Sequence, residues 1–421
     1  MHRRTVTREL DSPKLRRLRR ELREKRPSAE SRFLKSLART GTPIVEPVKG
    51  DSRSSWVTYI WRGDANTRSV GISSPQTAFG EFDRLSRLPR SRIWYRTVRV
   101  RNDCMGQYRL YPNLPSILPE DFDGYLHLLD RGKPDPLNPC QFVSPRDPEF
   151  PHNPMYGATC SVLHLKDAPN HSVVVRHART PAGAVKLYHL RSRVLKNRRR
   201  VWLYTPPSSR GRAGDAHLVI FFDGFGYVNE VSAPTILDNL LAKQRIPSTY
   251  AVFVDALDMG TRGRELTCNP EFGTFLVREL LPWSRRVLGL AFDGRHTTLA
   301  GCSYGGLCAM YSAMRYPKRF GGVISQSGSF WWAPQGAAEP NALSREFMRR
   351  PRLPLRIYMD AGRYEGHASA ENGAGHLAAN RHLRDVLLLK GYPVRYQTYN
   401  GGHDSYCWRQ TLVDALPWVL A

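Results

Sequence analysis

The sequence has few cysteines and no long apolar segment. Its 421 residues include seven cysteines, an odd number, and no two of them form a Cys-x-x-Cys pair. This scarcity argues against a disulfide framework and against a zinc knuckle, and it is typical of a reducing compartment. No run approaches the ~20 apolar residues that a membrane span requires, and no apolar stretch follows the basic N-terminus. We therefore expect a cytoplasmic protein with no membrane span and no secretory signal.

Acidic residues are scarce relative to basic ones. There are 37 Asp and Glu against 63 Lys and Arg, which gives a formal net charge of +26. A field of this sign attracts anionic partners, such as nucleic acid, an acidic membrane or a polyanionic small molecule. Hydrophobic residues make up 41% of the chain and aromatic residues 10%, which excludes a mainly disordered chain. The length predicts two domains.

The basic excess is concentrated at the N-terminus. Residues 1–40 hold 14 Lys and Arg and five Asp and Glu, a net charge of +9, and Leu15, Leu18 and Leu22 form the stripe of a helix. Two interpretations are open: an arm that binds nucleic acid or another anion, and a solvated helix or frayed terminus. No aromatic residue precedes Phe33 in the basic run. This weakens any proposal that the segment binds single-stranded nucleic acid by stacking aromatic side chains on its bases. We favour the solvated helix and treat residues 1–40 as a separate basic segment.

Residues 41–184 show the pattern of an all-β domain. Short β-rich runs at 56–61 and 93–100 are separated by clusters of Gly, Pro, Asn and Ser. The alternation in the second run is typical of a half-buried antiparallel strand, and a β-sandwich fits the segment. The stretch 131–156 is rich in Pro, Asp and Asn, so we predict a long irregular connection across the surface of this domain.

Residues 185–421 alternate between apolar strands and helices. The predicted strands are 200–205, 217–222, 250–254, 297–300, 322–325, 355–359 and 394–399, and the predicted helices include 272–288, 306–315 and 376–389. Continuous apolar strands separated by helices indicate a mostly parallel sheet covered on both faces. The predicted fold class is therefore α/β, an α/β-hydrolase domain preceded by a smaller all-β sandwich.

The segment Gly301-Cys-Ser303-Tyr-Gly305 matches the Gly-x-Ser-x-Gly nucleophile elbow. It follows a predicted strand and precedes a helix that Pro317 ends. The turn of an elbow holds its serine in a strained backbone conformation, and the flanking glycines avoid clashes with the neighbouring strand and helix. We therefore predict that Ser303 is a catalytic nucleophile.

A serine nucleophile needs a base, which in this fold follows the acid along the chain. His403 lies 100 residues beyond the nucleophile, in a Gly-rich loop after the last predicted strand, and this position selects it among 13 histidines. The acid is expected after the penultimate strand. We order the candidates Glu365, Asp360 and Asp404, and a serine–histidine dyad without a strong acid remains open.

The oxyanion hole of such a site uses backbone N–H groups. The first donor is predicted to be Tyr304, directly after the nucleophile. The second is predicted to be Gly224, in the Asp223-Gly-Phe-Gly-Tyr227 loop after an earlier strand, because glycine lets the backbone approach a substrate oxygen.

Further motifs carry a resemblance to the enterochelin (ferric enterobactin) esterases. Their order and spacing hold over roughly residues 198–412. They are Arg198-Arg-Arg-Val-Trp-Leu-Tyr-Thr-Pro206, Phe221-Phe-Asp-Gly224, Arg264-Glu-Leu-Thr-Cys-Asn269, Glu279-Leu-Leu-Pro282, the elbow itself, Ser327-Gly-Ser-Phe-Trp-Trp332, and Gly401-Gly-His-Asp404 with Cys407-Trp-Arg409. Upstream, Gly41-Thr-Pro-Ile-Val-Glu46, Val57-Thr-Tyr-Ile-Trp-Arg-Gly63 and Asp135-Pro-Leu-Asn-Pro139 resemble that family's N-terminal β-sandwich domain.

The resemblance implies hydrolysis of the trilactone backbone of an iron-loaded tris-catecholate siderophore in the cytoplasm. It places Ser303 and His403 on the family's nucleophile and base, with an acidic residue at the position of Glu365. It also implies substrate binding by three side chains near the catecholates: Arg264, Trp331 and Trp332. Core packing beneath the active site accounts for the two tryptophans equally well. Iron enters only as part of the substrate, so we expect no cofactor and no metal held by protein ligands.

Two alternatives stay open. The first is a general carboxylesterase of the same fold. The second is a non-catalytic basic protein that binds a siderophore or nucleic acid through its positive field, against which the paired Ser303 and His403 argue. Nucleic acid is therefore not an expected partner, and the sequence does not determine the oligomeric state.

Overall fold

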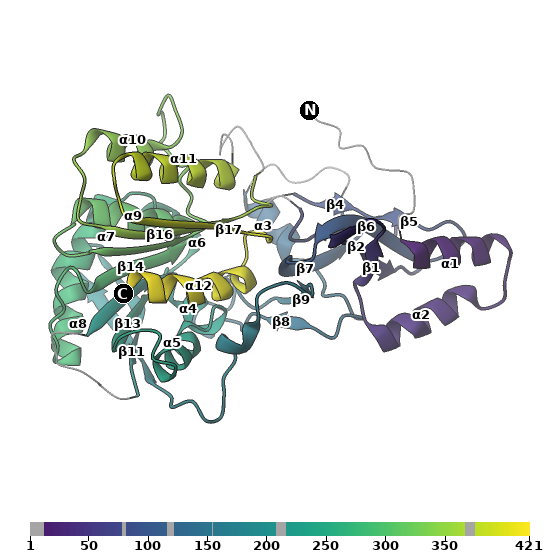
Figure 1. Ribbon diagram of the computed structural model, residues 1–421, viewed down its shortest axis with the longest axis horizontal. Helices are drawn as coiled ribbons and strands as arrows, with labels where there is room; N and C mark the ends of the chain where they lie inside the picture. Colours follow the sequence, from purple (N-terminus) through teal and green to yellow (C-terminus); the bar gives the residue numbers. More distant parts are fainter. Residues whose placement is uncertain (1–11, 78–80, 116–121, 154, 208–215, 367–374) are drawn as a thin grey trace. The chain divides into compact units, whose positions relative to one another are not determined.

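The computed structural model describes residues 12–421 apart from 78–80, 116–121, 154, 208–215 and 367–374. Two compact units make up the chain (Figure 1). The smaller comprises Met1–Arg146, Gly157–Ala168 and Asn400–Gly402, and the larger comprises Asp147–Tyr156, Pro169–Tyr399 and His403–Ala421. Every residue predicted for the catalytic site lies in the larger unit. No helix of the described residues is long and apolar enough to cross a membrane.

The smaller unit contains two antiparallel sheets, as the predicted β-sandwich requires. One has the order β1 (Ile44–Val48), β2 (Asp51–Arg62), β6 (Ile93–Arg101), β5 (Ser86–Arg87). The other has the order β4 (Asp83–Arg84), β3 (Val70–Ser73), β7 (Met105–Pro112), β9 (Thr159–His164), β8 (Gln141–Val143), and a helix, α3 (Phe122–Asp130), belongs to the same unit. The rings of Tyr59 in β2 and Tyr108 in β7 meet edge to face with centroids 4.9 Å apart, so buried aromatic side chains join the two sheets.

Two N-terminal helices, α1 (Pro13–Arg23) and α2 (Ala29–Thr40), pack on the four-stranded sheet. Leu15 and Leu18 are fully buried in a cluster with Ile60 of β2 and Ile93 of β6. The prediction of a solvated helix was therefore wrong for the leucine stripe, because its apolar face has a sheet to cover. These helices form one compact unit with the sandwich.

The stretch 131–156 differs from the predicted surface connection, since several of its polar side chains are buried. Tyr108 donates a hydrogen bond to Asp135 Oδ2 at 2.9 Å, and Asn138 Nδ2 donates to the Tyr108 hydroxyl at 2.9 Å. Asp147 is only 1% exposed. Asp and Asn in an irregular segment here satisfy buried polar groups, which composition alone does not distinguish from a solvated loop.

The larger unit is built on an eight-stranded sheet with the order β10-β11-β13-β12-β14-β15-β16-β17. The strands are β10 (Ala184–Ser192), β11 (Asn197–Thr205), β12 (His217–Phe222), β13 (Thr249–Val254), β14 (Thr297–Cys302), β15 (Gly322–Gln326), β16 (Arg356–Gly362) and β17 (Val394–Tyr399). Neighbouring strands from β13 to β17 are parallel, and the antiparallel β10–β11 hairpin completes one edge. The sequence prediction missed β10, most of whose residues are exposed.

Helices cover both faces of this sheet, which confirms the predicted α/β-hydrolase fold (Figure 1). They are α4 (Gly224–Asn229), α5 (Ala233–Ala242), α6 (Met259–Leu266), α7 (Pro270–Phe275), α8 (Leu281–Leu288), α9 (Tyr304–Arg315), α10 (Ala342–Arg349), α11 (Gly375–Leu389) and α12 (Ser405–Val419). The predicted helix 272–288 is interrupted by a π-helical segment, Leu276–Leu280. Pro282 follows two residues after this segment, and a proline removes a backbone donor from the helical pattern.

Candidate active site

Ser303 occupies the sharp turn between β14 and α9. Its backbone has φ 55° and ψ −121°, outside the regions that L-residues prefer. The neighbouring glycines permit this turn, because a Cβ on Gly301 would lie 2.4 Å from the backbone carbon of Gly305. The elbow geometry predicted from Gly-x-Ser-x-Gly is thus present, with the serine at the N-terminal end of a helix.

His403 and Glu365 meet beside the carboxyl end of the sheet. Glu365 Oε2 lies 2.8 Å from His403 Nδ1. The other carboxylate oxygen accepts hydrogen bonds from the Gly362 backbone N–H at 2.7 Å and the Ser327 hydroxyl at 2.7 Å. Burial raises the pKa of Glu365, but the charge and hydrogen bond of His403 outweigh it and bring the pKa to about 2. This carboxylate is therefore ionised at neutral pH and oriented toward the imidazole.

The structure gives different environments to the other two candidate acids. Asp360 is fully buried at the end of β16, where its Oδ1 accepts a hydrogen bond from the Ser327 backbone N–H at 3.0 Å. Burial raises the pKa of Asp360 to about 8, so this carboxyl is mainly neutral near pH 7. Asp404 caps α12 and accepts from the Cys407 backbone N–H at 2.9 Å. Geometry and charge thus favour Glu365 as the partner of His403.

Gly224 and Tyr304 begin the helices α4 and α9. A Cβ on Gly224 would lie 2.9 Å from the backbone of Phe253, so only glycine fits this position. Arg262, which the sequence prediction missed, links the two helix starts. Its guanidinium donates to both oxygens of Asp223 at 2.7 and 2.8 Å and lies 5.5 Å from the centroid of the Tyr304 ring. One buried arginine thus contacts both loops that carry the predicted oxyanion donors.

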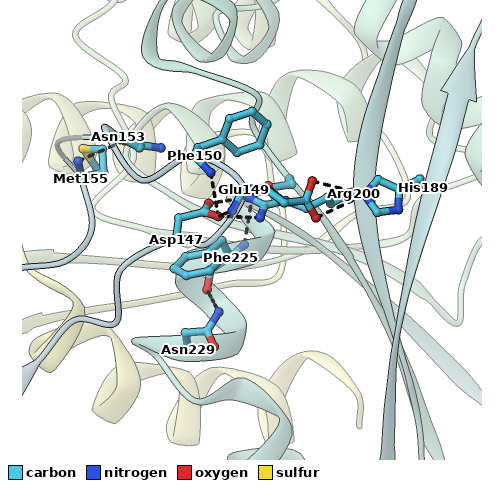
Figure 2. Close-up of polar contacts among 10 residues, drawn as sticks. Asp147, Glu149, Phe150, Asn153, Met155, His189, Arg200, Phe225 and Asn229 are labelled. Carbon is cyan, nitrogen blue, oxygen red and sulfur yellow. Dashed lines mark hydrogen bonds and ion pairs between the residues drawn. The ribbon is translucent and has the colours of Figure 1, made fainter.

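A second buried arginine anchors the residue that follows Gly224 (Figure 2). Asp255 Oδ1 accepts the Phe225 backbone N–H at 3.2 Å, and its Oδ2 accepts from Arg200 Nε at 2.8 Å. Arg200 Nη1 also donates to Asp147 Oδ1 at 2.7 Å. Figure 2 shows Arg200 reaching Asp147 beside the Phe225 ring, with Phe150 on the same segment as Asp147. The Asp147–Tyr156 segment is thereby fixed to the loop of Gly224.

A second histidine, also missed by the sequence prediction, lies beside the nucleophile. Ser303 Oγ is 3.2 Å from Ser329 Oγ, which is 3.4 Å from His376 Nε2. Trp331 Nε1 donates to the same nitrogen of His376 at 3.1 Å. Burial lowers the pKa of His376 to about 3, so its imidazole is neutral. Its ring centroid is 4.7 Å from that of His403.

The three predicted substrate-binding residues have different positions. Trp331 is partly buried beside the elbow, with its ring centroid 6.0 Å from that of Tyr304. Trp332 packs against the hydrophobic core while partly exposed. Arg264 is exposed on α6, where its Nη2 donates to the Thr261 hydroxyl at 3.2 Å. The structure therefore brings Trp331, but not Arg264, into contact with the nucleophile loop.

These residues include the types that acyl transfer requires, carried by loops at one end of the parallel sheet. A serine on a strained turn, an imidazole oriented by an ionised carboxylate and two helix-start N–H groups on a parallel sheet are the components of an α/β-hydrolase site. Fold and site together define a serine hydrolase.

Comparisons with known proteins specify the family. Residues 192–419 match the family described as "Putative esterase", and residues 56–174 match the family described as "Enterochelin esterase, N-terminal". The chain is 30% identical to the iron(III) enterobactin esterase of Dickeya dadantii over 423 residues, which cover 93% of each chain. It is 28% identical to the iron(III) enterobactin esterase of Escherichia coli K12, over 79% of this chain and 80% of the relative.

Solved structures of similar fold point to the same family. The enterobactin esterase of Shigella flexneri, crystallised in the presence of enterobactin, is 25% identical with a TM-score of 0.71, covering 94% of this chain and 98% of that one. The ferric enterobactin esterase of Salmonella typhimurium is 26% identical with a TM-score of 0.75, over 91% of this chain and 98% of that one. The chain belongs to the enterobactin esterase family and is a carboxylic ester hydrolase, which confirms the predicted resemblance and enzyme class.

Proposed function

We propose that this enzyme hydrolyses the ester bonds of the trilactone backbone of ferric enterobactin-type siderophores, and that it does so in the cytoplasm. The observation that carries the proposal is the hydrogen-bonded His403–Glu365 pair on the same sheet edge as the strained Ser303. The family membership supplies the substrate class, since relatives over most of the chain are named for enterobactin.

In the proposed mechanism, His403 Nε2 accepts the proton of Ser303 while Ser303 Oγ attacks a lactone carbonyl. Nδ1–H of the resulting imidazolium donates to Glu365, whose ionised carboxylate stabilises the new positive charge. The oxyanion accepts hydrogen bonds from the backbone N–H groups of Tyr304 and Gly224, each worth about 2.7–4 kcal/mol in such sites. As the C–O bond breaks, His403 donates its proton to the leaving seryl oxygen, which departs as a hydroxyl, and water attacks the acyl-enzyme by the same route.

Charge supports an anionic substrate. A ferric tris-catecholate is polyanionic, and the chain carries a formal net charge of +26, so long-range attraction favours their encounter. We assign Trp331 and Trp332 as candidates for contact with catechol rings, and Arg264 as an exposed cation available to the catecholate oxygens. Iron in this scheme belongs to the substrate and has no role in the bond-breaking steps.

Chromatography of the products tests the proposal. Purified protein incubated with ferric enterobactin is expected to release linear dihydroxybenzoylserine trimer, dimer and monomer. The Ser303→Ala variant should release none, whereas Ser86→Ala, an exposed serine of β5, should match the wild type. Hydrolysis of simple aryl esters without cleavage of the siderophore would support the proposed catalytic site and contradict the proposed substrate. Near-normal cleavage by Ser303→Ala would overturn the mechanism.

A further inference from the structure

Two histidines and one carboxylate converge at the active site. One potential ligand atom from each of Glu365, His376 and His403 lies within 4.8 Å of the other two. Glu365 and His376 are 4% and 7% exposed. The three side chains come from different parts of the larger unit: Glu365 from the loop after β16, His376 from the first turn of α11, and His403 from the loop after β17. The fold, rather than a local sequence motif, creates the cluster.

This set of donors is one that transition metals use. Two imidazoles and a carboxylate bind zinc in catalytic sites and ferrous iron in non-haem oxygenases. With metal–ligand bonds of about 2.0–2.1 Å, the donors of a tetrahedral site lie about 3.4 Å apart. The widest separation among the three atoms, at most 4.8 Å, therefore has to close by up to about 1.4 Å when a metal binds. Glu365 and His403, 2.8 Å apart across a hydrogen bond, have to separate by about 0.6 Å, because the metal replaces the proton between them.

We propose that Glu365, His376 and His403 form an inhibitory binding site for one divalent transition-metal ion such as Zn²⁺. Inhibition follows from the chemistry of the ligands, because a lone pair given to a metal is unavailable for a proton. A metal on His403 removes the base that activates Ser303, and a metal on Glu365 removes the carboxylate that orients it. The inhibition thus rests on the proposed function of this pair, whereas metal binding itself does not.

Trp331 competes with the metal for His376. Its indole N–H, which can only donate, is hydrogen-bonded to His376 Nε2 at 3.1 Å. The lone pair of that nitrogen is the one directed toward Ser329 and the nucleophile. A metal that binds His376 through Nε2 must therefore displace the tryptophan hydrogen bond. Removing the N–H is expected to tighten metal binding by about fivefold, the usual worth of one such bond.

Two measurements on the full-length protein test the proposal. The first is inhibition of chromogenic aryl-ester hydrolysis by Zn²⁺, with reversal by EDTA. The second is the visible absorption of Co²⁺ bound to Ser303→Ala, which reports ligation without turnover. One equivalent of metal is expected in each case. His376→Asn should lose at least tenfold in metal affinity, whereas His382→Asn, an exposed histidine on the same helix, should match its parent. Trp331→Phe should be inhibited at about fivefold lower Zn²⁺.

The outcomes separate this proposal from the catalytic one. Ester hydrolysis that is insensitive to Zn²⁺, or inhibition unchanged in both His376→Asn and Trp331→Phe, would overturn the metal site and leave the catalytic assignment intact. One equivalent of Co²⁺ bound through His376, in a protein that cleaves no ester, would retain the metal site and overturn the catalytic assignment. If His376→Asn does not fold, Trp331→Phe and the Co²⁺ spectrum still decide the question.

Discussion

The identity of the catalytic acid yields a quantitative prediction. Replacing Glu365 by Gln keeps the size of the side chain and removes the charge that faces His403. The interactions of the carboxylate lower the pKa of Glu365 from 4.5 to about 2 despite complete burial, a net preference for the ionised form of about 3 kcal/mol. The same carboxylate stabilises the imidazolium that forms in the transition state, so the variant should lose about 10²- to 10³-fold in kcat. A loss near 10⁴-fold is expected if the glutamine also selects the wrong imidazole tautomer.

Asp360→Asn is the matched control, because Asp360 is the other carboxyl at the end of the same strand. Its pKa is raised to about 8 by burial, so at pH 7 the amide replaces a mainly neutral acid, and kcat should stay within about threefold of the wild type. The assay is steady-state hydrolysis of an aryl ester at pH 7, with thermal unfolding to verify that both variants fold. Glu365→Gln with nearly full activity, combined with an inactive but folded Asp360→Asn, would refute the reasoning.

Three further predictions concern buried ionisable side chains. Arg262→Lys keeps the positive charge but loses the bidentate hydrogen bonds to Asp223. We expect kcat to fall by about 10- to 100-fold, less than the loss of a whole oxyanion donor, with little change in KM. An unchanged kcat would contradict this role of Arg262. Asp147→Asn breaks one of the two buried ion pairs of Arg200 and should cost about 3 kcal/mol in urea unfolding, whereas a loss below 0.5 kcal/mol would show that the pair is dispensable. Burial lowers the pKa of His217 from 6.5 to about 4. Between these pH values the unfolded chain binds a proton that the folded chain does not, so the stability of the fold decreases as the pH falls. The melting temperature of His217→Gln relative to the wild type should therefore be higher at pH 5 than at pH 8, and an equal difference at both pH values would refute this prediction.

Features set by local backbone constraints were predictable from the sequence. The elbow at Ser303 needs glycines at fixed offsets and a strand followed by a helix, so its motif predicts its geometry. His403 was selectable among 13 histidines because chain order in this fold places the base after the last strand. Both β12 and β17 have the predicted bounds, and in β12 the reason is a continuous apolar run, which marks a buried parallel strand.

Features that depend on tertiary partners were not predictable in this way. His376 reaches the site from α11, and Arg262 reaches Asp223 from α6. Neither residue belongs to a sequence motif that would indicate these contacts. The leucine stripe of α1 predicted a helix but not the sheet that buries it. Asp147, in a segment with the composition of a surface loop, is buried because Arg200 compensates its charge.

Capture of the acyl-enzyme tests the central claim most directly. Turnover of ferric enterobactin is quenched in acid within milliseconds to seconds, and the protein is digested and mapped by mass spectrometry. In the wild type we expect a dihydroxybenzoylserine-containing ester on the peptide that carries Ser303. The ester should be longer-lived in His403→Ala, provided that this variant still forms it, and it should be missing from Ser303→Ala. Product formation together with an adduct on another residue, or with the same adduct yield in Ser303→Ala, would contradict it.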